Sequence, residues 1–160
     1  MNVAAAVRKP LIAISLAILL AFSALAQTAT PPDLSGSWVL NLAKSKLGKH
    51  ATIGSETIVI TCPNSTIQFH NTTDGKESTV IYIPDGKEHI VKQISDSQIF
   101  SKAQWKKSVL VTESGGRIVG GAASGVEPIN IKSRWTLSAD GRVLTQEMDD
   151  PRQVFVYDKQ

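Results

Sequence analysis

SRWTLSADGRVLTQE, residues 133–147, is the stretch that decides the fold class. The Asp140-Gly141 pair at its centre tolerates the positive φ angles of a two-residue hairpin turn, so it predicts two antiparallel strands joined by that turn. Closing the turn places side chains of like character opposite one another: Leu137 with Leu144, Trp135 with Gln146, Arg134 with Glu147, and Thr136 with Thr145. Because a slip by one residue would invert both faces, this agreement favours the β reading.

Two further Asp-Gly pairs, Asp74-Gly75 and Asp85-Gly86, each separate runs of alternating apolar residues and predict two more hairpins. Counting residue pairs outward from these two turns places six side chains on one face: Ile67, Phe69, Val80, Tyr82, His89 and Val91. We expect this mostly apolar face to point inward. The opposite face is polar except for three isoleucines, which indicate that something covers part of it: Ile81, Ile83 and Ile90.

The same period of two recurs along most of the chain in segments rich in Val, Ile, Thr and aromatic residues, which is typical of strands. We predict strands at residues 36–42, 56–62, 66–72, 77–83, 88–94, 98–105, 108–113, 129–138, 143–148 and 152–158. A meander of such strands leaves exposed edges unless it closes on itself. The expected fold is therefore all-β, a single antiparallel meander β-barrel of about eight to ten strands.

Two segments do not fit the strand pattern. Residues 43–54 mix lysines, small residues and glycines, and suit a short helix or a loop that caps one end of the barrel. Residues 114–125 contain five glycines, which predicts a bent edge strand or a loop. Neither the GxGxxG nor the GxxxxGK[ST] phosphate-binding pattern occurs there.

The first 26 residues have the order of a secretory signal peptide. Arg8 and Lys9 precede the apolar run 11–22, and Ala24 and Ala26 provide the small side chains of a cleavage site. The run is too short for a permanent membrane span. We therefore expect residues 1–26 to be a signal peptide, 27–33 an exposed leader and 34–160 the β-barrel domain, exported to the periplasm or outside the cell.

Composition excludes several classes of partner. Without Arg8 and Lys9 the remaining chain has 15 basic and 14 acidic residues, scattered rather than clustered, so neither a nucleic acid nor a membrane surface is an expected partner. Charged residues on nearly every outward face also argue against a membrane barrel. The single cysteine, Cys62, cannot form an internal disulfide and is expected to be buried and inert.

The segment Leu34-Ser-Gly-Ser-Trp38-Val-Leu40 resembles the Gly-x-Trp opening of the calycin group, the lipocalins and fatty-acid-binding proteins. Gly36 to Ser45 and Trp135 to Thr145 together are similar to the two ends of uncharacterised secreted bacterial lipocalin-like proteins. The resemblance implies a lipocalin-like barrel in which Trp38 plugs one end, with Arg152 or Arg134 beneath its ring. Phe155 stands where fatty-acid-binding proteins have a carboxylate-binding arginine, and only Tyr157 of that motif is present.

Chemistry-bearing motifs are missing from the sequence. His50, His70 and His89 show no metal-ligand spacing, and no serine or cysteine lies in a nucleophile pattern. The carboxylates Asp149 and Asp150 fit a turn before a proline. We expect no metal, no cofactor and no enzyme activity.

Two functions remain open at the level of the sequence. The first is a binding module that holds a small apolar or amphipathic molecule against the six-residue face, with Tyr82 and His89 supplying polar contacts. The second is a solid-core barrel that acts as an extracytoplasmic protein-interaction or inhibitor module, for example through residues 114–125.

Overall fold

The computed structural model describes residues 30–48, 52–119, 129–149 and 152–160. Ten strands and no helix occur in these residues. The strands are β1 (Gly36–Leu40), β2 (Glu56–Thr61), β3 (Ile67–Thr73), β4 (Lys76–Tyr82), β5 (Asp85–Ile94), β6 (Ser97–Lys106), β7 (Val109–Ile118), β8 (Ile129–Leu137), β9 (Val143–Met148) and β10 (Gln153–Lys159). The all-β prediction is confirmed, and each predicted strand corresponds to an observed one.

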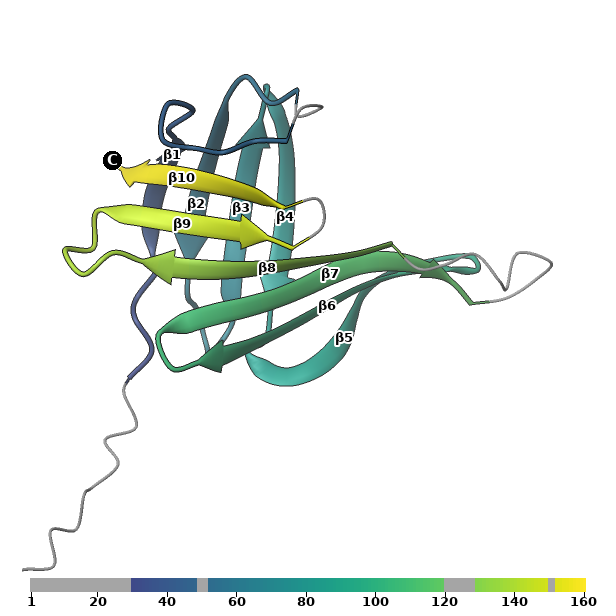
Figure 1. Ribbon diagram of the computed structural model, residues 1–160. Coiled ribbons are helices and arrows are strands. Elements are labelled where there is room, and N and C mark those ends of the chain that lie inside the picture. Colours follow the sequence, from purple (N-terminus) through teal and green to yellow (C-terminus); the bar gives the residue numbers. More distant parts are fainter. Residues whose placement is uncertain (1–29, 49–51, 120–128, 150–151) are drawn as a thin grey trace, which may run out of the picture.

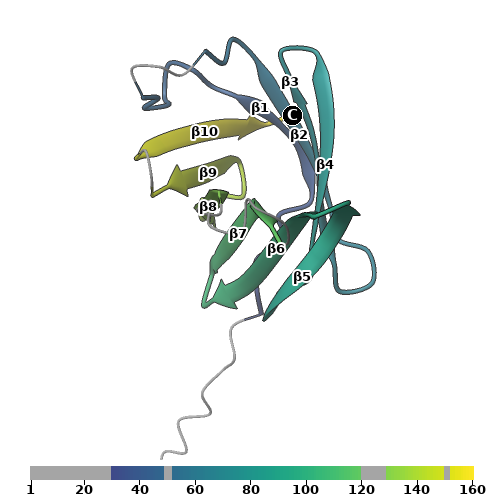
Figure 2. The same ribbon diagram turned by 90° about the vertical axis from the view of Figure 1, so that its right-hand side faces the viewer.

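The ten strands form one antiparallel sheet in the order β4-β3-β2-β1-β10-β9-β8-β7-β6-β5. The first and last strands pair, with Trp38 opposite Lys159 and Leu40 opposite Tyr157, so the meander curls into a nearly closed barrel. The two free edges of the sheet belong to β4 and β5. Figures 1 and 2 show β1–β4 as one wall and β5–β7 as another, with β8–β10 between them.

Two predicted hairpins have the expected register. In the β3–β4 hairpin Asp74 and Gly75 both have positive φ, 47° and 77°, and Ile67 lies opposite Tyr82. In the β8–β9 hairpin all four predicted pairs form. Of Asp140 and Gly141, only Gly141 has a positive φ. The last hydrogen bond before the turn joins Ser138 N–H to Val143 O at 2.8 Å, one residue farther from the turn on each strand than a two-residue turn would place it. A wider turn therefore preserves the same register.

The third predicted hairpin, at Asp85-Gly86, is wrong. Strands β4 and β5 are not paired and form the two edges of the barrel seam. Gly86 has positive φ but Asp85 does not, and the Asp85 carboxylate instead accepts the Lys87 N–H at 2.8 Å. Pro84 adds a constraint, because the residue before a proline is held extended. The chain therefore turns away, and β5 pairs only with β6.

A second irregularity lies within β5. Its register against β6 shifts between Ile90, opposite Phe100, and Lys92, opposite Ile99. Val91 is the extra residue of this β-bulge and has no partner in the ladder. Its predicted position opposite Val80 across a β4–β5 hairpin is therefore also wrong.

The core fills the part of the barrel enclosed by β1–β4 and β6–β10. Its largest fully buried side chains include Trp38, Tyr157, Ile58, Leu110 and Leu144. An aromatic chain runs through it: the ring centroid of Phe69 lies 5.5 Å from that of Tyr82 and 4.8 Å from that of Trp135, and Trp135 stacks on Tyr157 at 6.4 Å. Such pairs stabilise a core beyond their area burial.

Several sequence predictions concern the segments between strands. Residues 30–33 form no strand, and Leu34 is buried. The described part of 43–54 is a loop that pairs with β10 through Lys46 and Val154, whose N–H donates to Lys46 O at 2.9 Å. Residues 114–118 belong to β7. The predicted signal peptide (1–26), His50 and residues 120–125 lie outside the described residues.

Among the residues that the structure describes, no helix has the length and apolar character needed to cross a bilayer. Cys62 is exposed rather than buried, so that expectation is wrong. It lies just after β2 ends, where the chain leaves the sheet.

Candidate functional site

The barrel seam opens into a cleft of about 780 Å³ between β4 and strands β5–β8. We call it the apolar cleft. Most of its lining side chains are aliphatic: Val80, Ile81, Ile83, Ile90, Val91, Ile99, Ile129 and Ile131. The seam creates this cleft, because β5 bends away from β4 and leaves apolar side chains of both strands uncovered.

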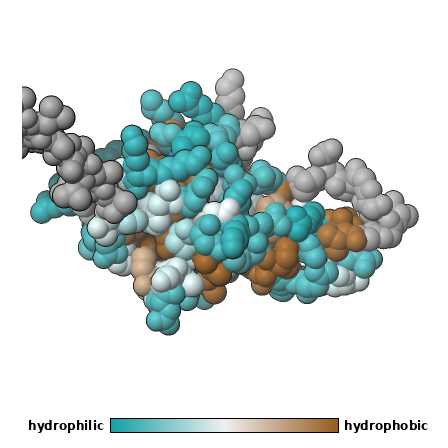
Figure 3. Space-filling view, turned by 90° about the horizontal axis from the view of Figure 1, so that it is seen from below, coloured by the Kyte–Doolittle hydropathy of each residue, from teal (hydrophilic) through white to brown (hydrophobic). Residues whose placement is uncertain are grey.

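The far wall of the cleft is an arm that projects from the barrel (Figure 1). The arm consists of residues 90–100, 113–119 and 129–131. Ile129 is 69% exposed, and six other aliphatic residues of the cleft lining are more than one third exposed. Figure 3 shows apolar side chains gathered on the underside of the molecule toward the arm. An exposed apolar patch of this kind marks a binding surface more often than a solvated face.

The arm depends on a close approach between β7 and β8. A Cβ atom added at Gly115 would lie 1.8 Å from the backbone oxygen of Ile129 and 3.0 Å from the Phe100 ring. Only glycine fits between those groups. Gly115 therefore fixes the depth of the cleft by letting β8 cross tightly over β7.

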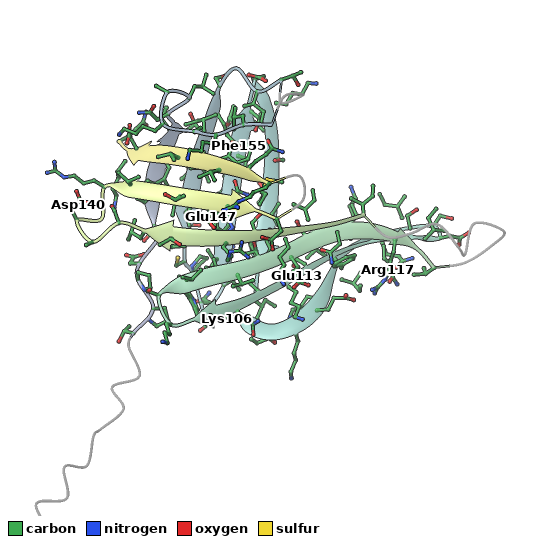
Figure 4. The ribbon with its side chains drawn as sticks, in the orientation of Figure 1. Lys106, Glu113, Arg117, Asp140, Glu147 and Phe155 are labelled. Atoms are coloured by element: carbon green, nitrogen blue, oxygen red, sulfur yellow. The ribbon has the colours of Figure 1, made fainter. Side chains whose placement is uncertain are left out.

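Charged groups brace the arm from its outer side. Arg117 donates to Glu88 on β5 at 2.7 Å and to Gln98 at 3.1 Å, and its guanidinium lies 5.3 Å from the centroid of the Phe100 ring. Figure 4 shows Arg117 on the arm and Asp140 at the opposite end of the molecule. Phe100 in turn lines the cleft, so this bracing holds one of its walls.

The polar groups of the cleft are few. His89 Nε2 lies 3.0 Å from an Asp85 carboxylate oxygen, and Lys92 lies on the exposed side of β5. The Lys87 backbone N–H, followed by the His89 ring, holds the pKa of Asp85 below its usual value. The cleft is therefore a predominantly apolar surface with polar groups on β5.

A second, smaller cavity of about 110 Å³ lies inside the barrel, and we call it the inner pocket. Its lining includes one carboxylate and two amide side chains, those of Glu56, Asn71 and Gln146. The other lining residues belong to the core: Ile58, Phe69, Val80, Tyr82 and Trp135. Val80 lines both cavities, so the two share a wall residue on β4.

The polar side chains of the inner pocket are tied to neighbouring strands. The hydroxyls of Thr73 and Tyr157 donate to the two oxygens of Glu56 at 3.1 and 2.8 Å. Gln146 Nε2 donates to the Ser133 hydroxyl at 3.1 Å. Burial, and then the neighbouring Glu56 carboxylate, raises the pKa of Tyr157, so its hydroxyl remains a donor.

The six side chains predicted to share a ligand face do not share one cavity. Val80, His89 and Val91 line the apolar cleft, whereas Phe69, Val80 and Tyr82 line the inner pocket. Ile67 lines neither and is buried in the core. The division follows from the missing β4–β5 hairpin, because the predicted face assumed that β5 continues the barrel wall.

Trp38 is fully buried, and its indole N–H donates to the Leu34 carbonyl at 2.9 Å. The cation beside its ring is Lys159, 5.1 Å from the centroid, so the predicted Arg152 and Arg134 contacts are wrong. Antiparallel pairing of β1 with β10 places Lys159 opposite Trp38. Arg152 is exposed, and Arg134 instead forms ion pairs with Asp149 and Glu147.

Several residues that line these cavities were not predicted from the sequence. The inward position of Glu56 and Gln146 could have been predicted. Glu56 alternates with the buried Ile58 and Ile60 on β2, and Gln146 lies opposite Trp135, which points inward. Ile129 and Ile131 gave no such signal, since their role depends on the bend of the arm. Ile81, Ile83 and Ile90, three apolar residues on a polar face, line the cleft.

Among the described residues, no group of three or more His, Cys, Asp or Glu side chains is placed to hold a metal ion. His70 Nδ1 lies 3.0 Å from the Thr79 hydroxyl. The cavities therefore offer apolar contact and hydrogen bonding as their means of recognition.

No protein-family model and no curated protein sequence matches the chain. Its β-barrel fold is similar to those of solved protein structures. A REP1-NXSQ fatty acid transporter is 14% identical over 80% of this chain and 96% of its own, with a TM-score of 0.53. Apo lipid binding protein 8 of Caenorhabditis elegans is 13% identical over 79% of this chain and 94% of its own, with a TM-score of 0.54.

Proposed function

We propose that this protein binds a small hydrophobic or amphipathic molecule in the apolar cleft. The observation that carries the proposal is a cavity of about 780 Å³ lined by aliphatic side chains that the fold leaves uncovered. This volume lies within the usual range of small-molecule sites, about 300–1,000 Å³. Of the residues predicted from the sequence, Val80, His89 and Val91 would contact the ligand.

The fold likeness supports this proposal. Two proteins of similar fold are a fatty acid transporter and a lipid binding protein. The packed core supports a ligand site at the seam rather than in the barrel centre, because buried side chains of β1–β4 and β6–β10 fill that centre.

The proposed ligand would be met outside the cytoplasm. Residues 1–26 have the charge, apolar run and small residues of a signal peptide, and the rest of the chain is nearly neutral. We infer that the protein carries its ligand in the periplasm or outside the cell. Mass measurement of the secreted or periplasmic product tests this directly, with Gln27 as the expected first residue.

The binding proposal is tested by titration with diphenylhexatriene, a hydrocarbon fluorophore that brightens in apolar sites. We expect one saturable site in the wild-type protein, and a loss of affinity of at least ten-fold in the Val91→Asp variant, which puts a charge in the cleft. Val59→Asp is the matched control, because Val59 is similarly exposed on β2 but lies outside the cleft. Equal affinities of the two folded variants would refute the site.

One observation favours a protein-interaction role as a second candidate. Ile94, Ile118 and Val119 lie exposed near the end of the arm, outside the cleft lining. Such a patch suits a protein partner. In this case Ile118→Ser would reduce cross-linking to a specific partner in the exporting cell while leaving the fluorophore affinity unchanged; unchanged cross-linking would argue against the role.

A further inference from the structure

The inner pocket adds a chemical constraint on the ligand. It contains one charged group, the Glu56 carboxylate, and its lining includes no lysine or arginine. Val80 belongs to the linings of both the inner pocket and the apolar cleft. A molecule whose hydrocarbon part lies in the cleft and whose polar end passes Val80 would meet the Glu56 carboxylate.

Hydrogen bonding in the inner pocket leaves acceptors in excess. The Tyr157 hydroxyl lies 2.8 Å from Glu56 Oε2 and 3.3 Å from Gln146 Oε1, but it carries only one proton. The shorter bond, to the carboxylate, takes that proton. Among the described residues no other side chain donates to Gln146 Oε1, so this oxygen can accept a further hydrogen bond.

The Glu56 carboxylate also retains acceptor capacity. An ionised carboxylate offers about four lone-pair sites, and the hydroxyls of Thr73 and Tyr157 occupy two of them. The remaining polar groups of the lining are the Asn71 amide, which can donate or accept, and the Tyr82 hydroxyl. Glu56 is the one charged side chain of this lining, and its carboxylate and the Gln146 oxygen are both acceptors.

We propose, resting on the cleft as the binding site, that the ligand is a long-chain alcohol or amine whose hydrogen-bond-donating end lies between Glu56 and Gln146. A hydroxyl donates one hydrogen bond, and a protonated amine up to three, to the acceptors that the protein leaves free. A fatty carboxylate is disfavoured there, because it would bring a second negative charge beside Glu56 without a cation to balance it.

The structure also defines the competing arrangement. Lys92 lies on β5 in the cleft lining. A carboxylate ligand would place its charged end near Lys92 and leave the inner pocket unused. The two arrangements predict opposite rankings of ligands that share one chain length.

The experiment is displacement of diphenylhexatriene from the wild-type protein by decylamine, 1-decanol and decanoate at pH 7.5, each below its micellar concentration. We expect the amine and the alcohol to displace the fluorophore at concentrations at least ten-fold lower than decanoate. Decanoate that displaces equally well or better overturns the proposal while leaving the cleft as a binding site. Fluorophore that does not bind at all would instead contradict the proposed function itself.

Two variants then assign the effect to the inner pocket. Glu56→Gln removes the charge and should reduce the preference for decylamine over decanoate at least ten-fold. Glu147→Gln, one residue from Gln146 on β9 (Figure 4), removes a carboxylate that is 49% exposed and should leave the preference unchanged. An unchanged preference in folded Glu56→Gln overturns the assignment.

The wild-type ranking decides the proposal even where Glu56→Gln does not fold. In addition, decylamine should shift the side-chain amide resonances of Gln146 in a ¹H–¹⁵N spectrum of the wild-type protein. A wild-type spectrum in which saturating decylamine leaves those resonances in place would overturn the placement of the polar end.

Discussion

Gly115 is the residue on which the shape of the cleft depends most directly, and replacing it with alanine tests that dependence. The added Cβ would start 1.8 Å from the Ile129 carbonyl oxygen, whereas ordinary contact begins at 3.4 Å. Strands β7 and β8 would therefore have to separate by about 1.6 Å at this point. A shift of that size disrupts the pairing of Gly115 with Asn130 and of Gly116 with Ile129.

We expect Gly115→Ala to lower the free energy of unfolding by about 1–3 kcal/mol, the usual cost of an overpacked site. For a domain of this size each kcal/mol corresponds to roughly 2–8 °C in melting temperature. Because the displaced segment carries Ile129 and Ile131, affinity for diphenylhexatriene should also fall at least ten-fold. Urea unfolding followed by tryptophan fluorescence, together with the fluorophore titration, measures both effects.

Gly116→Ala is the matched control for this prediction. Its Cβ would meet Gln98 O at 3.7 Å, an ordinary contact, and the residue has no positive φ. Gly116→Ala should therefore be as stable as the wild-type protein or more stable by about 0.5–1 kcal/mol, since alanine lowers the entropy of the unfolded chain. Gly115→Ala that matches Gly116→Ala in both stability and binding would refute the reasoning.

Three further predictions concern the barrel itself. Leu144→Ala should lower the free energy of unfolding by about 2–5 kcal/mol in urea titrations, because Leu144 is fully buried, and a smaller loss would contradict the packed core. Tyr157→Phe should cost about 1.5–3 kcal/mol in the same assay through the lost hydrogen bond to Glu56, and an unchanged stability would show that the bond contributes nothing. The Lys44 ammonium and then the Asn41 amide hold the pKa of Asp158 below its usual value in the folded protein. The carboxylate therefore protonates more readily in the unfolded chain. Its contribution to stability is complete above its usual pKa and is lost as the pH falls through the pKa of the folded state. Melting temperature should accordingly decline less steeply below pH 4 in Asp158→Asn than in the wild-type protein.

The features that could be predicted from the sequence are those that depend on residues close together in the chain. The register of β8 against β9 follows from the turn and from the pairing of Leu137 with Leu144, and both lie within a few residues of Asp140. The all-β fold and the curling of the meander into a barrel also followed, because a period of two and the edge problem are properties of the whole chain. Pairing of β1 with β10 is observed, but β4 and β5 remain as unpaired edges, so the barrel is only nearly closed.

The seam could not be predicted from the same pattern. Asp85-Gly86 has the composition of a hairpin turn, yet β5 can pair with either β4 or β6. In the structure β5 pairs with β6, from Asp85 opposite Gln104 to Ile94 opposite Ser97. The free edge of β4 is partly bonded to β6 instead, since the Ser101 hydroxyl donates to Ile81 O at 3.1 Å. These are tertiary contacts, and no local motif encodes them.

The candidate site was missed for the same reason. A face drawn through Phe69, Val80 and Val91 assumed a continuous wall, whereas the seam splits it into two cavities. Ile81 and Ile90 carried the better signal, as apolar residues on a face that should have been solvated. They line the cleft because the seam uncovers both faces of its edge strands.

The most direct test of the account is a methyl spectrum of the protein with ¹³C-labelled isoleucines, titrated with 1-decanol. If the cleft is the binding site, the methyl signals of Ile81, Ile90 and Ile131 shift together and saturate with one affinity, while that of the buried Ile60 stays in place. Saturable binding that leaves those three signals unmoved would contradict the account, as would the absence of any binding.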